Sequence, residues 1–465
     1  MSTKGVKSIN MLSGSIIRGI VEFSIPIMVM NVLQSMFNII DMTVLKMYNT
    51  GNGYAVGAVG TCGTLISLIT GLLIGISAGA NVIAARHIGR GDRERVERTV
   101  GSAILFSICG GAFISVVGIV FAEVFLGLMN CPDELMSEAA LYFRMYFAGV
   151  PISMVYNFCA SLLRSTGDSK RPMMFLTIGG VIKIAFNFLF VAVFHLGVVG
   201  VALGTIISWS FCAFMGLRAL LKGEGLVKLF PHRLRFYKQE LTDVLKIGVP
   251  AGLQQALYSI ANVIITATVN TYGPAATTGI SIANNFDGIL YQISIAPSLA
   301  VMPYVSQNIG AGNLRRAKES VWKGMLVTVV LGATFGSLSA IFSGQLSSIM
   351  SSDPAVIEYS RQKMIIISST YFICGINEIM GASLKGMGKP IIPTISTLIF
   401  MCLIRFVWVY GIFPIWQAFG PDAFDLTFLY LIWPIGWTLS IITLVCFYIP
   451  TVKRLAGKMS ASALS

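Results

Sequence analysis

Two octapeptides, ARHIGRGD at 85–92 and SQNIGAGN at 306–313, indicate an internal repeat in this chain. The second begins 221 residues after the first, and this offset aligns identical residues within the octapeptides and beyond them. The aligned pairs are Ile88 with Ile309, Gly89 with Gly310, Gly91 with Gly312, Arg95 with Arg316, Met129 with Met350, Leu163 with Leu384, Gly167 with Gly388, and Pro172 with Pro393. We infer that the two halves of the chain share one architecture.

The segments between these clusters are apolar enough to cross a membrane. Of the 465 residues, 55% are hydrophobic and 11% are charged, whereas soluble domains carry roughly 25% charged residues. A helical span needs about 20 apolar residues. Twelve spans are predicted, at 20–42, 54–85, 100–129, 139–163, 173–195, 197–217, 247–272, 279–309, 324–350, 364–384, 391–416 and 426–449. This pattern excludes a soluble protein.

The repeat and the spans together predict the fold class. We expect an all-α integral membrane protein with twelve transmembrane helices in two six-helix lobes related by an internal parallel repeat. An even number of spans per repeat gives both halves the same orientation, and paired bundles of this kind are a transporter architecture. The predicted division is an N-terminal lobe at 1–222, a basic cytoplasmic linker at 223–246 and a C-terminal lobe at 247–465.

Basic residues indicate the orientation of the chain in the membrane. Of the 33 lysines and arginines, 27 lie in the two termini and the even-numbered loops. Lys46, Arg361 and Lys363 are the basic residues expected in loops on the opposite side. Because basic loops stay in the cytoplasm, we expect a multi-pass protein of a bacterial-type inner cell membrane with both termini cytoplasmic. The net charge of +13 is thus a topology signal, and no nucleic-acid partner is expected.

Several classes of catalytic motif are missing from the sequence. The eight cysteines form no CxxC pair, the three histidines are dispersed, and neither HExxH nor a GxxxxGK[ST] loop occurs. One GxSxG lies at 75–79, inside a predicted span rather than at a strand-to-helix turn. We therefore predict no enzyme, no metal site and no cofactor.

Ionisable residues within apolar spans are the functional candidates, because burying them in a bilayer is costly. Asp41 shares the first predicted span with Gln34 and Asn38, which form a polar stripe, and with Pro26, which can bend the helix. Lys183 is a candidate partner for Asp41 if the two side chains meet. A proton arriving at Asp41 would then release Lys183 and change helix packing.

The sequence resembles the multidrug and toxic compound extrusion (MATE) family along nearly its whole length. The resemblance is carried by FSIPIMVMNVLQSMFNIIDMTVL (23–45), LLRSTGDSKRPM (162–173), GVPAGLQQALYSIANVII (248–265), SQNIGAGN (306–313) and SLKGMGKPIIP (383–393). It implies a two-lobed, V-shaped bundle of twelve helices. It also implies export of cationic, amphipathic compounds in exchange for protons or sodium ions.

The same resemblance assigns roles around Asp41. An aspartate at this position serves ion coupling in many prokaryotic members, and Asn157, Asn187 and Thr205 occupy matching places in the N-terminal lobe. This chain departs from the pattern at Asn187, where many members have an aspartate, and at Lys183, where they have an asparagine. A fixed cation competes with sodium for a site that requires several oxygen ligands. A proton is therefore the expected coupling ion, with sodium as the alternative.

Candidates in the second half are Asp287 and Glu378 for ion coupling, with a buried structural carboxyl as the alternative for each. Arg405 is expected to pair with one of these carboxylates, with a role in substrate binding as the alternative. A lipophilic cation favours aromatic faces and adaptable polar groups. The substrate-binding candidates of the whole chain are Gln34, Phe37, Asn38, Asn157, Thr205, Tyr258, Asn262 and Tyr291.

Together these features predict a secondary active antiporter that exports organic cations, including multiple drugs, by alternating access. The alternative is a flippase of the same superfamily for a lipid-linked oligosaccharide or another anionic substrate, which Lys183 and Arg405 would favour. The expected partners are small organic cations and the lipid bilayer. The protein is expected to act as a monomer.

Overall fold

The computed structural model describes residues 9–48, 54–128, 131, 133–223, 227–419 and 426–463. Within these ranges the chain is helical and contains no β-strand. It divides into two compact units. The first unit includes Pro26–Gly252, and the second includes Met11–Ile25 and Leu253–Ser465. The first helix of each predicted lobe thus contributes residues to both units, whereas the predicted lobe boundaries placed each helix in one lobe.

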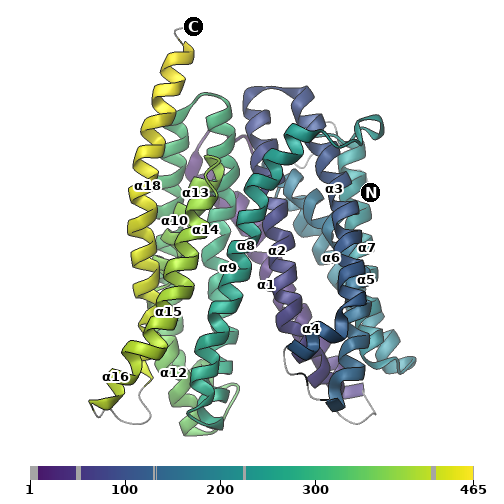
Figure 1. Ribbon diagram of the computed structural model, residues 1–465, viewed down its shortest axis with the longest axis vertical. Helices are drawn as coiled ribbons and strands as arrows, with labels where there is room; N and C mark the ends of the chain where they lie inside the picture. The colour runs from purple at the N-terminus through teal and green to yellow at the C-terminus, as the bar shows by residue number, and fades with distance from the viewer. Residues whose placement is uncertain are drawn as a thin grey trace. The chain divides into compact units, whose positions relative to one another are not determined.

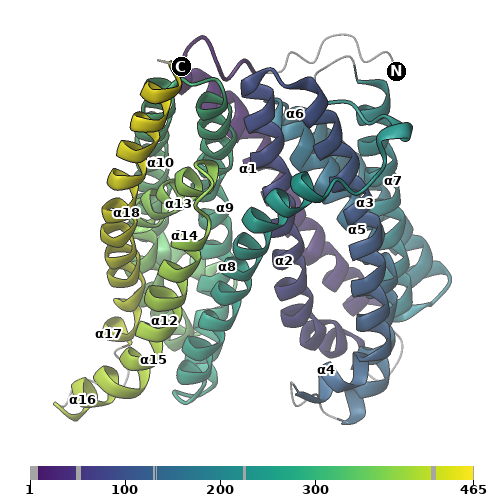
Figure 2. The same ribbon diagram turned by 45° about the horizontal axis from the view of Figure 1, so that its top comes forward.

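The first unit contains the helices of the N-terminal repeat. They are α1 (Ile16–Tyr48, from Pro26 onward), α2 (Tyr54–Arg90), α3 (Arg93–Val120), α4 (Ala122–Leu128), α5 (Asp133–Ser165), α6 (Lys170–Asn187), the π-helix η1 (Phe188–Val193), α7 (Gly197–Lys222) and the 3-10 turn η2 (Pro231–Arg233). α5 packs against α2, α3 and α7 (Figure 2). α5 is therefore the central helix of this unit.

The second unit contains the equivalent helices. They are α8 (Lys238–Asn270, from Leu253 onward), α9 (Pro274–Gly310), α10 (Leu314–Ile341), α11 (Ser343–Ser348), α12 (Pro354–Ser369), α13 (Tyr371–Gly386), α14 (Ile391–Thr397), the π-helix η3 (Leu398–Leu403), α15 (Ile404–Val407), the π-helix η4 (Trp408–Ile412), α16 (Phe413–Ala418), α17 (Thr427–Tyr430) and α18 (Ile432–Ala463). α9 packs against α10, α12 and α13 (Figure 1).

The 221-residue repeat is visible in the helix boundaries. α3 and α10 begin and end at equivalent positions, as do α5 and the segment from the start of α12 to the end of α13. The turns repeat as well: Gly91 and Gly312 have φ of 71° and 75°, a conformation that glycine adopts without strain. Asp92 and Asn313 then cap α3 and α10 by accepting hydrogen bonds from backbone N–H groups. Each octapeptide therefore spans the end of one helix and the turn that leads into the next.

Most predicted spans coincide with long apolar helices. Among the described residues, ten helices have the length and hydropathy to cross a membrane, and the bent pair α12–α13 raises the number to eleven. α8, which has 33 residues and ends at Asn270, contains all but the last two residues of the remaining predicted span, 247–272. The predicted tenth span, 364–384, was wrong at its start, because the helix begins at Pro354 and bends by 48° between Ser369 and Tyr371. The third and ninth spans are likewise each broken into two helices.

This difference also corrects the position of Lys363. The sequence placed it in a loop, whereas the structure places it inside α12 with 4% of its surface exposed. The boundary error arose because the charged first half of α12 has low hydropathy. A cation expected at the membrane surface is thus buried within the second unit.

Glycines bring two helices of the first unit into backbone contact. A Cβ added at Gly75 of α2 would lie 2.3 Å from the Cα of Gly252, and one at Gly79 would lie 2.2 Å from the carbonyl oxygen of Val244. The same holds from the side of α8: a Cβ added at Gly248 or Gly252 would lie 2.4 Å or 2.6 Å from a backbone carbonyl oxygen of α2. Small residues four apart permit this approach in membrane helices. The GxSxG at 75–79 is therefore a helix-packing motif.

The cysteines differ in exposure. Cys62, Cys131, Cys159, Cys212, Cys374 and Cys402 are buried. Cys109 on α3 and Cys446 on α18 are exposed. Each unit thus carries one thiol that protein packing does not cover, on a helix that can cross the membrane.

Candidate ion and substrate sites in the two units

A buried polar cluster in the first unit joins α1 to α6. The ammonium Nζ of Lys183 lies 2.5 Å from Oδ2 of Asp41, and Nδ2 of Asn187 donates to Oδ1 of Asp41 at 2.6 Å. The three residues are 9%, 8% and 0% exposed, in the order Lys183, Asp41, Asn187. Both oxygens of the carboxylate are therefore satisfied, and the hypothesised contact between Asp41 and Lys183 forms.

Two glycines make room for this cluster. A Cβ on Gly204 of α7 would lie 2.0 Å from Oδ1 of Asn187, and one on Gly180 of α6 would lie 1.8 Å from the ring of Phe37. Asn187 is also the last residue of α6 before the wider turns of η1. Such π-helical turns re-aim side chains and are frequent at functional sites. The local sequence thus positions the amide against the carboxylate.

The other predicted residues of this unit are not joined to Asp41 by a described hydrogen bond. Asn157 donates to the Ser153 carbonyl at 2.9 Å, and Thr205 donates to the Val201 carbonyl at 2.9 Å, each within its own helix. Gln34 is exposed. The side chain of Asn38 lies outside the described residues.

The second unit contains a cavity of about 400 Å³. Four predicted residues line it: Tyr258, Asn262, Asp287 and Tyr291. Glu378 does not line the cavity but accepts a hydrogen bond from the Tyr258 hydroxyl at 3.1 Å. The cavity therefore unites residues of α8 and α9 that the sequence proposed separately for ion coupling and substrate binding.

Two buried cations also line this cavity. Nζ of Lys363 lies 2.9 Å from Oδ2 of Asp287 and donates to Asn284. Nη1 of Arg405 donates to Oδ1 of Asn262 at 2.7 Å. The guanidinium carbon of Arg405 lies 4.8 Å from the ring centre of Trp433, and Nζ of Lys363 lies 5.9 Å from the same centre.

The expected pairing of Arg405 was wrong. Its side chain is 2% exposed, and among the described residues it forms an ion pair with neither Glu378 nor Asp287. Asp287 instead forms an ion pair with Lys363, a residue that the sequence predicts in a loop. Arg405 therefore keeps a positive charge that no described carboxylate contacts.

The two units arrange equivalent helices in equivalent ways. The offset of 221 residues places Asn262 at the position of Asp41, and it places Arg405 one residue after the position of Lys183. In the first unit the pair is a carboxylate with a cation. In the second it is an amide with a cation. The repeat thus retains the contact but changes its charge balance.

Sequence reasoning missed the cationic and aromatic lining of this cavity. The unassigned residues are Asn284, Lys363, Trp433 and Trp437, whereas Arg405 was expected to be a structural partner or, in the flippase alternative, a group that favours an anionic substrate. A signal was available: Asp287 in a span requires a partner, and Lys363 adjoins the predicted tenth span. The tryptophans have no charged residue close to them in the sequence to mark them.

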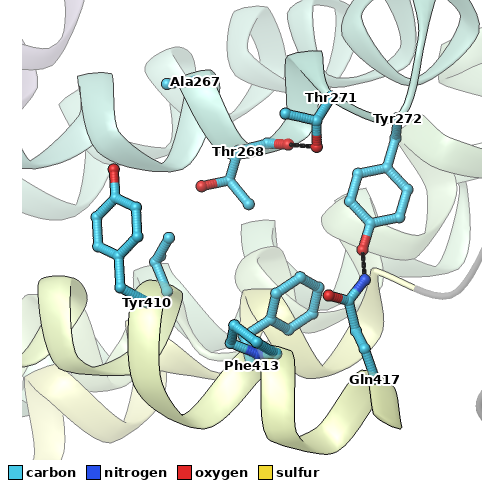
Figure 3. A pocket seen from close by; sticks show the side chains of 9 residues that line it. Ala267, Thr268, Thr271, Tyr272, Tyr410, Phe413 and Gln417 are labelled. Carbon is cyan, nitrogen blue, oxygen red and sulfur yellow. Dashed lines mark hydrogen bonds between the residues drawn. The ribbon is translucent and has the colours of Figure 1, made fainter.

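A second cavity of about 480 Å³ lies between the end of α8 and η4–α16 of the same unit. Figure 3 shows Tyr272 and Gln417 joined by a hydrogen bond at its edge, with Thr268 and Phe413 beside it. The residues that line it are uncharged. It therefore offers little to hold an ion.

Comparison with known families identifies the chain. The family model MatE matches residues 26–189 and 250–410, one segment in each repeat. The chain belongs to the MatE family. The multidrug and toxic compound extrusion resemblance seen in the motifs is thereby confirmed, and so is the all-α membrane fold of two six-helix lobes.

Relatives of this MatE chain match it along most of their length. The probable multidrug resistance protein YoeA of Bacillus subtilis (strain 168) is 28% identical over 421 residues, or 89% of this chain and 87% of its own. The FAD transporter of Shewanella oneidensis is 24% identical and covers 82% of this chain and 84% of its own. A solved outward-facing multidrug resistance MATE transporter of the MOP superfamily has a TM-score of 0.87 at 19% identity, covering 97% and 99% of the two chains. This MatE protein is thus similar to multi-pass membrane transporters.

Proposed function

We propose that this MatE protein is an antiporter that exports amphipathic organic compounds in exchange for protons. The observation that supports this proposal is the buried contact of Asp41 with Lys183 and Asn187. A buried ion pair does little for stability by itself, whereas removing one charge leaves the other uncompensated. The cluster is therefore suited to a switch.

Protonation of Asp41 supplies that switch. The carboxylic acid no longer attracts the Lys183 ammonium, so the contact between α1 and α6 weakens. Lys183 then turns toward water or toward a substrate. The proton thus favours one helix packing over another, which is what coupling requires.

The composition of the cluster supports a proton over sodium. Sodium requires several oxygen ligands, but one Asp41 oxygen faces an ammonium and the other faces an amide N–H. The Lys183 ammonium occupies the place that a metal cation would take. Sodium coupling stays as the alternative, through Asp287 or Glu378 in the second unit.

Two substrate classes remain in this proposal. Several relatives are named as multidrug resistance or export proteins, which supports the predicted organic cations. One relative is named an FAD transporter, and the uncompensated Arg405 favours an anionic substrate. The protein would act as a monomer in a bacterial-type inner cell membrane, with both termini cytoplasmic as the basic loops predict.

The test is transport in proteoliposomes of the full chain. Movement of ethidium is measured under an imposed pH gradient and, separately, under an imposed sodium gradient. We expect movement driven by the pH gradient alone. Movement driven only by sodium would overturn proton coupling, and movement under neither gradient would overturn ethidium as a substrate.

Lys183→Asn tests the role of the ion pair. We expect the initial rate of pH-driven transport to fall at least tenfold, which corresponds to about 1.4 kcal/mol, because Asp41 loses the charge that its protonation releases. The pH profile of the rate should also differ from that of the parent protein. Lys170→Asn, at the exposed start of the same helix, is the matched control. An unchanged pH profile in Lys183→Asn would exclude the pair from the switch.

A further inference from the structure

We propose that the cavity of the second unit binds an anionic aromatic compound, with the anionic oxygen group at Arg405 and the ring system against Trp433. This inference rests on the proposed function, because the bound compound would be an exported substrate in addition to the ethidium of that test. It names a ligand class opposite in charge to the organic cations expected from the sequence.

The charge of the cavity lining supports an anion. Its charged members among the described residues are Asp287, Lys363 and Arg405. Asp287 and Lys363 neutralise each other at 2.9 Å, so Arg405 leaves one positive charge. Glu378 lies behind Tyr258, outside the lining. An organic cation entering this cavity would meet a net charge of its own sign.

The guanidinium group has unused donors that can bind such a ligand. Nη1 donates to Asn262, but Nε is buried without a hydrogen-bond partner. A buried donor without a partner is costly. An arginine fork matches the geometry of phosphate and carboxylate, which can accept two parallel hydrogen bonds. An anionic oxygen group is the ligand that satisfies both the charge and the donor.

The internal repeat shows that the position of Asn262 can hold a carboxylate. Asp41 neutralises the cation in the first unit, and Asn262 occupies the equivalent position in the second. Asn262 holds the guanidinium by a hydrogen bond without cancelling its charge. The second unit therefore keeps the position of the cation but leaves the charge for a ligand.

Aromatic side chains provide the second half of the recognition. Trp433 and Trp437 of α18 line the cavity together with Tyr291 of α9. Trp433 contacts both buried cations through its ring. A planar ring system beside these aromatic faces would gain stacking contacts as well as burial. A volume of about 400 Å³ is in the range of small-molecule sites.

The backbone around Arg405 has an unusual conformation. Arg405 lies on the four-residue α15, between the π-helices η3 and η4. Wider helical turns of this kind are frequent at functional sites. They turn a side chain that an uninterrupted α-helix would direct elsewhere.

Binding is tested on the detergent-purified full chain without any ion gradient. Flavin mononucleotide and riboflavin share one fluorescent ring system, and only the former carries a phosphate. We expect flavin mononucleotide to bind roughly tenfold to a hundredfold more tightly, the range for hydrogen bonds to charged groups, with fluorescence quenched by the tryptophans.

Dodecyl phosphate, an anion without a ring, should compete weakly, and ethidium should not compete. Equal affinity for the two flavins would overturn the anion site, and strong competition by dodecyl phosphate would indicate a lipid phosphate instead of an aromatic compound.

Asn262→Asp places a carboxylate beside Arg405 with almost no change in side-chain size. We expect the preference for flavin mononucleotide over riboflavin to disappear in this variant and in Arg405→Gln. Arg361→Gln removes an exposed arginine of α12, and it should keep the preference. A retained preference in Asn262→Asp would overturn the assignment to Arg405.

The outcome separates the two proposals. If the parent protein binds the two flavins equally well but transports ethidium under a pH gradient, only the anion site is overturned. Tighter binding of flavin mononucleotide than of riboflavin, together with ethidium movement driven only by sodium, would overturn proton coupling and leave the binding site in place.

Discussion

Asp41→Asn is expected to abolish proton-driven export while the protein remains folded. The amide has nearly the size of the carboxyl group and can still accept a hydrogen bond from Asn187, but it cannot take up a proton. Lys183 would then keep its charge at all stages, without the carboxylate 2.5 Å away. We expect the initial rate of pH-driven transport to fall to the background of empty liposomes.

Glu22→Gln is the matched control for this experiment. Glu22 lies on the same helix and pairs with Arg18 at an exposed position, where the two side chains are 46% and 80% exposed. Exposed ion pairs contribute little, so this variant should transport at close to the parent rate. Substantial pH-driven transport by Asp41→Asn would move the coupling group to Asp287 or Glu378.

Gly75→Val is expected to destabilise the first unit strongly. The added Cβ would lie 2.3 Å from backbone atoms of Gly252, and a backbone cannot move aside as a flexible side chain can. Overpacking typically costs about 1–3 kcal/mol and sometimes more. We expect the melting temperature in detergent to fall by roughly 5–10 °C, together with a loss of transport.

Gly63→Val on the same helix separates packing from helix propensity. A Cβ at Gly63 meets no described heavy atom within 4 Å, and the same valine is introduced. This variant should melt within about 2 °C of the parent protein, since substitutions away from packed features have small effects. Equal destabilisation by both variants would mean that the contact between α2 and α8 is not the cause.

The repeat and the long apolar helices could be predicted because each depends on residues close together in sequence. Turn glycines such as Gly91 and Gly312 occur at equivalent positions in both halves. A membrane span can be recognised from the length of its apolar segment. The start of the tenth span was missed because charged residues, namely Glu358, Arg361 and Lys363, interrupt α12 before its apolar end. In the structure one of those residues, Lys363, is neutralised by Asp287 of α9, so hydropathy along the chain could not reveal its burial.

The candidate sites were predictable to the extent that one partner lay in an apolar span. Asp41 and Lys183 can be recognised because neither predicted span offers a residue of opposite charge. Each therefore requires a partner on another helix, and this led to the hypothesis that they contact each other. The partner of Arg405 was mistaken because charge alone favours a carboxylate. The actual partner, Asn262, is an amide that the 221-residue offset aligns with Asp41, but its hydrogen bond to Arg405 is visible only in the structure.

The distribution of thiols has a consequence for spectroscopy. Six cysteines are shielded by packing, whereas Cys109 and Cys446 are exposed, one in each unit. Both lie within helices that can cross the membrane, so a lipid-soluble thiol-reactive spin label should attach at two defined places in the unaltered protein. Pulsed dipolar distance measurements between those labels, recorded at low and high pH, would follow transport-related motion without any engineered residue.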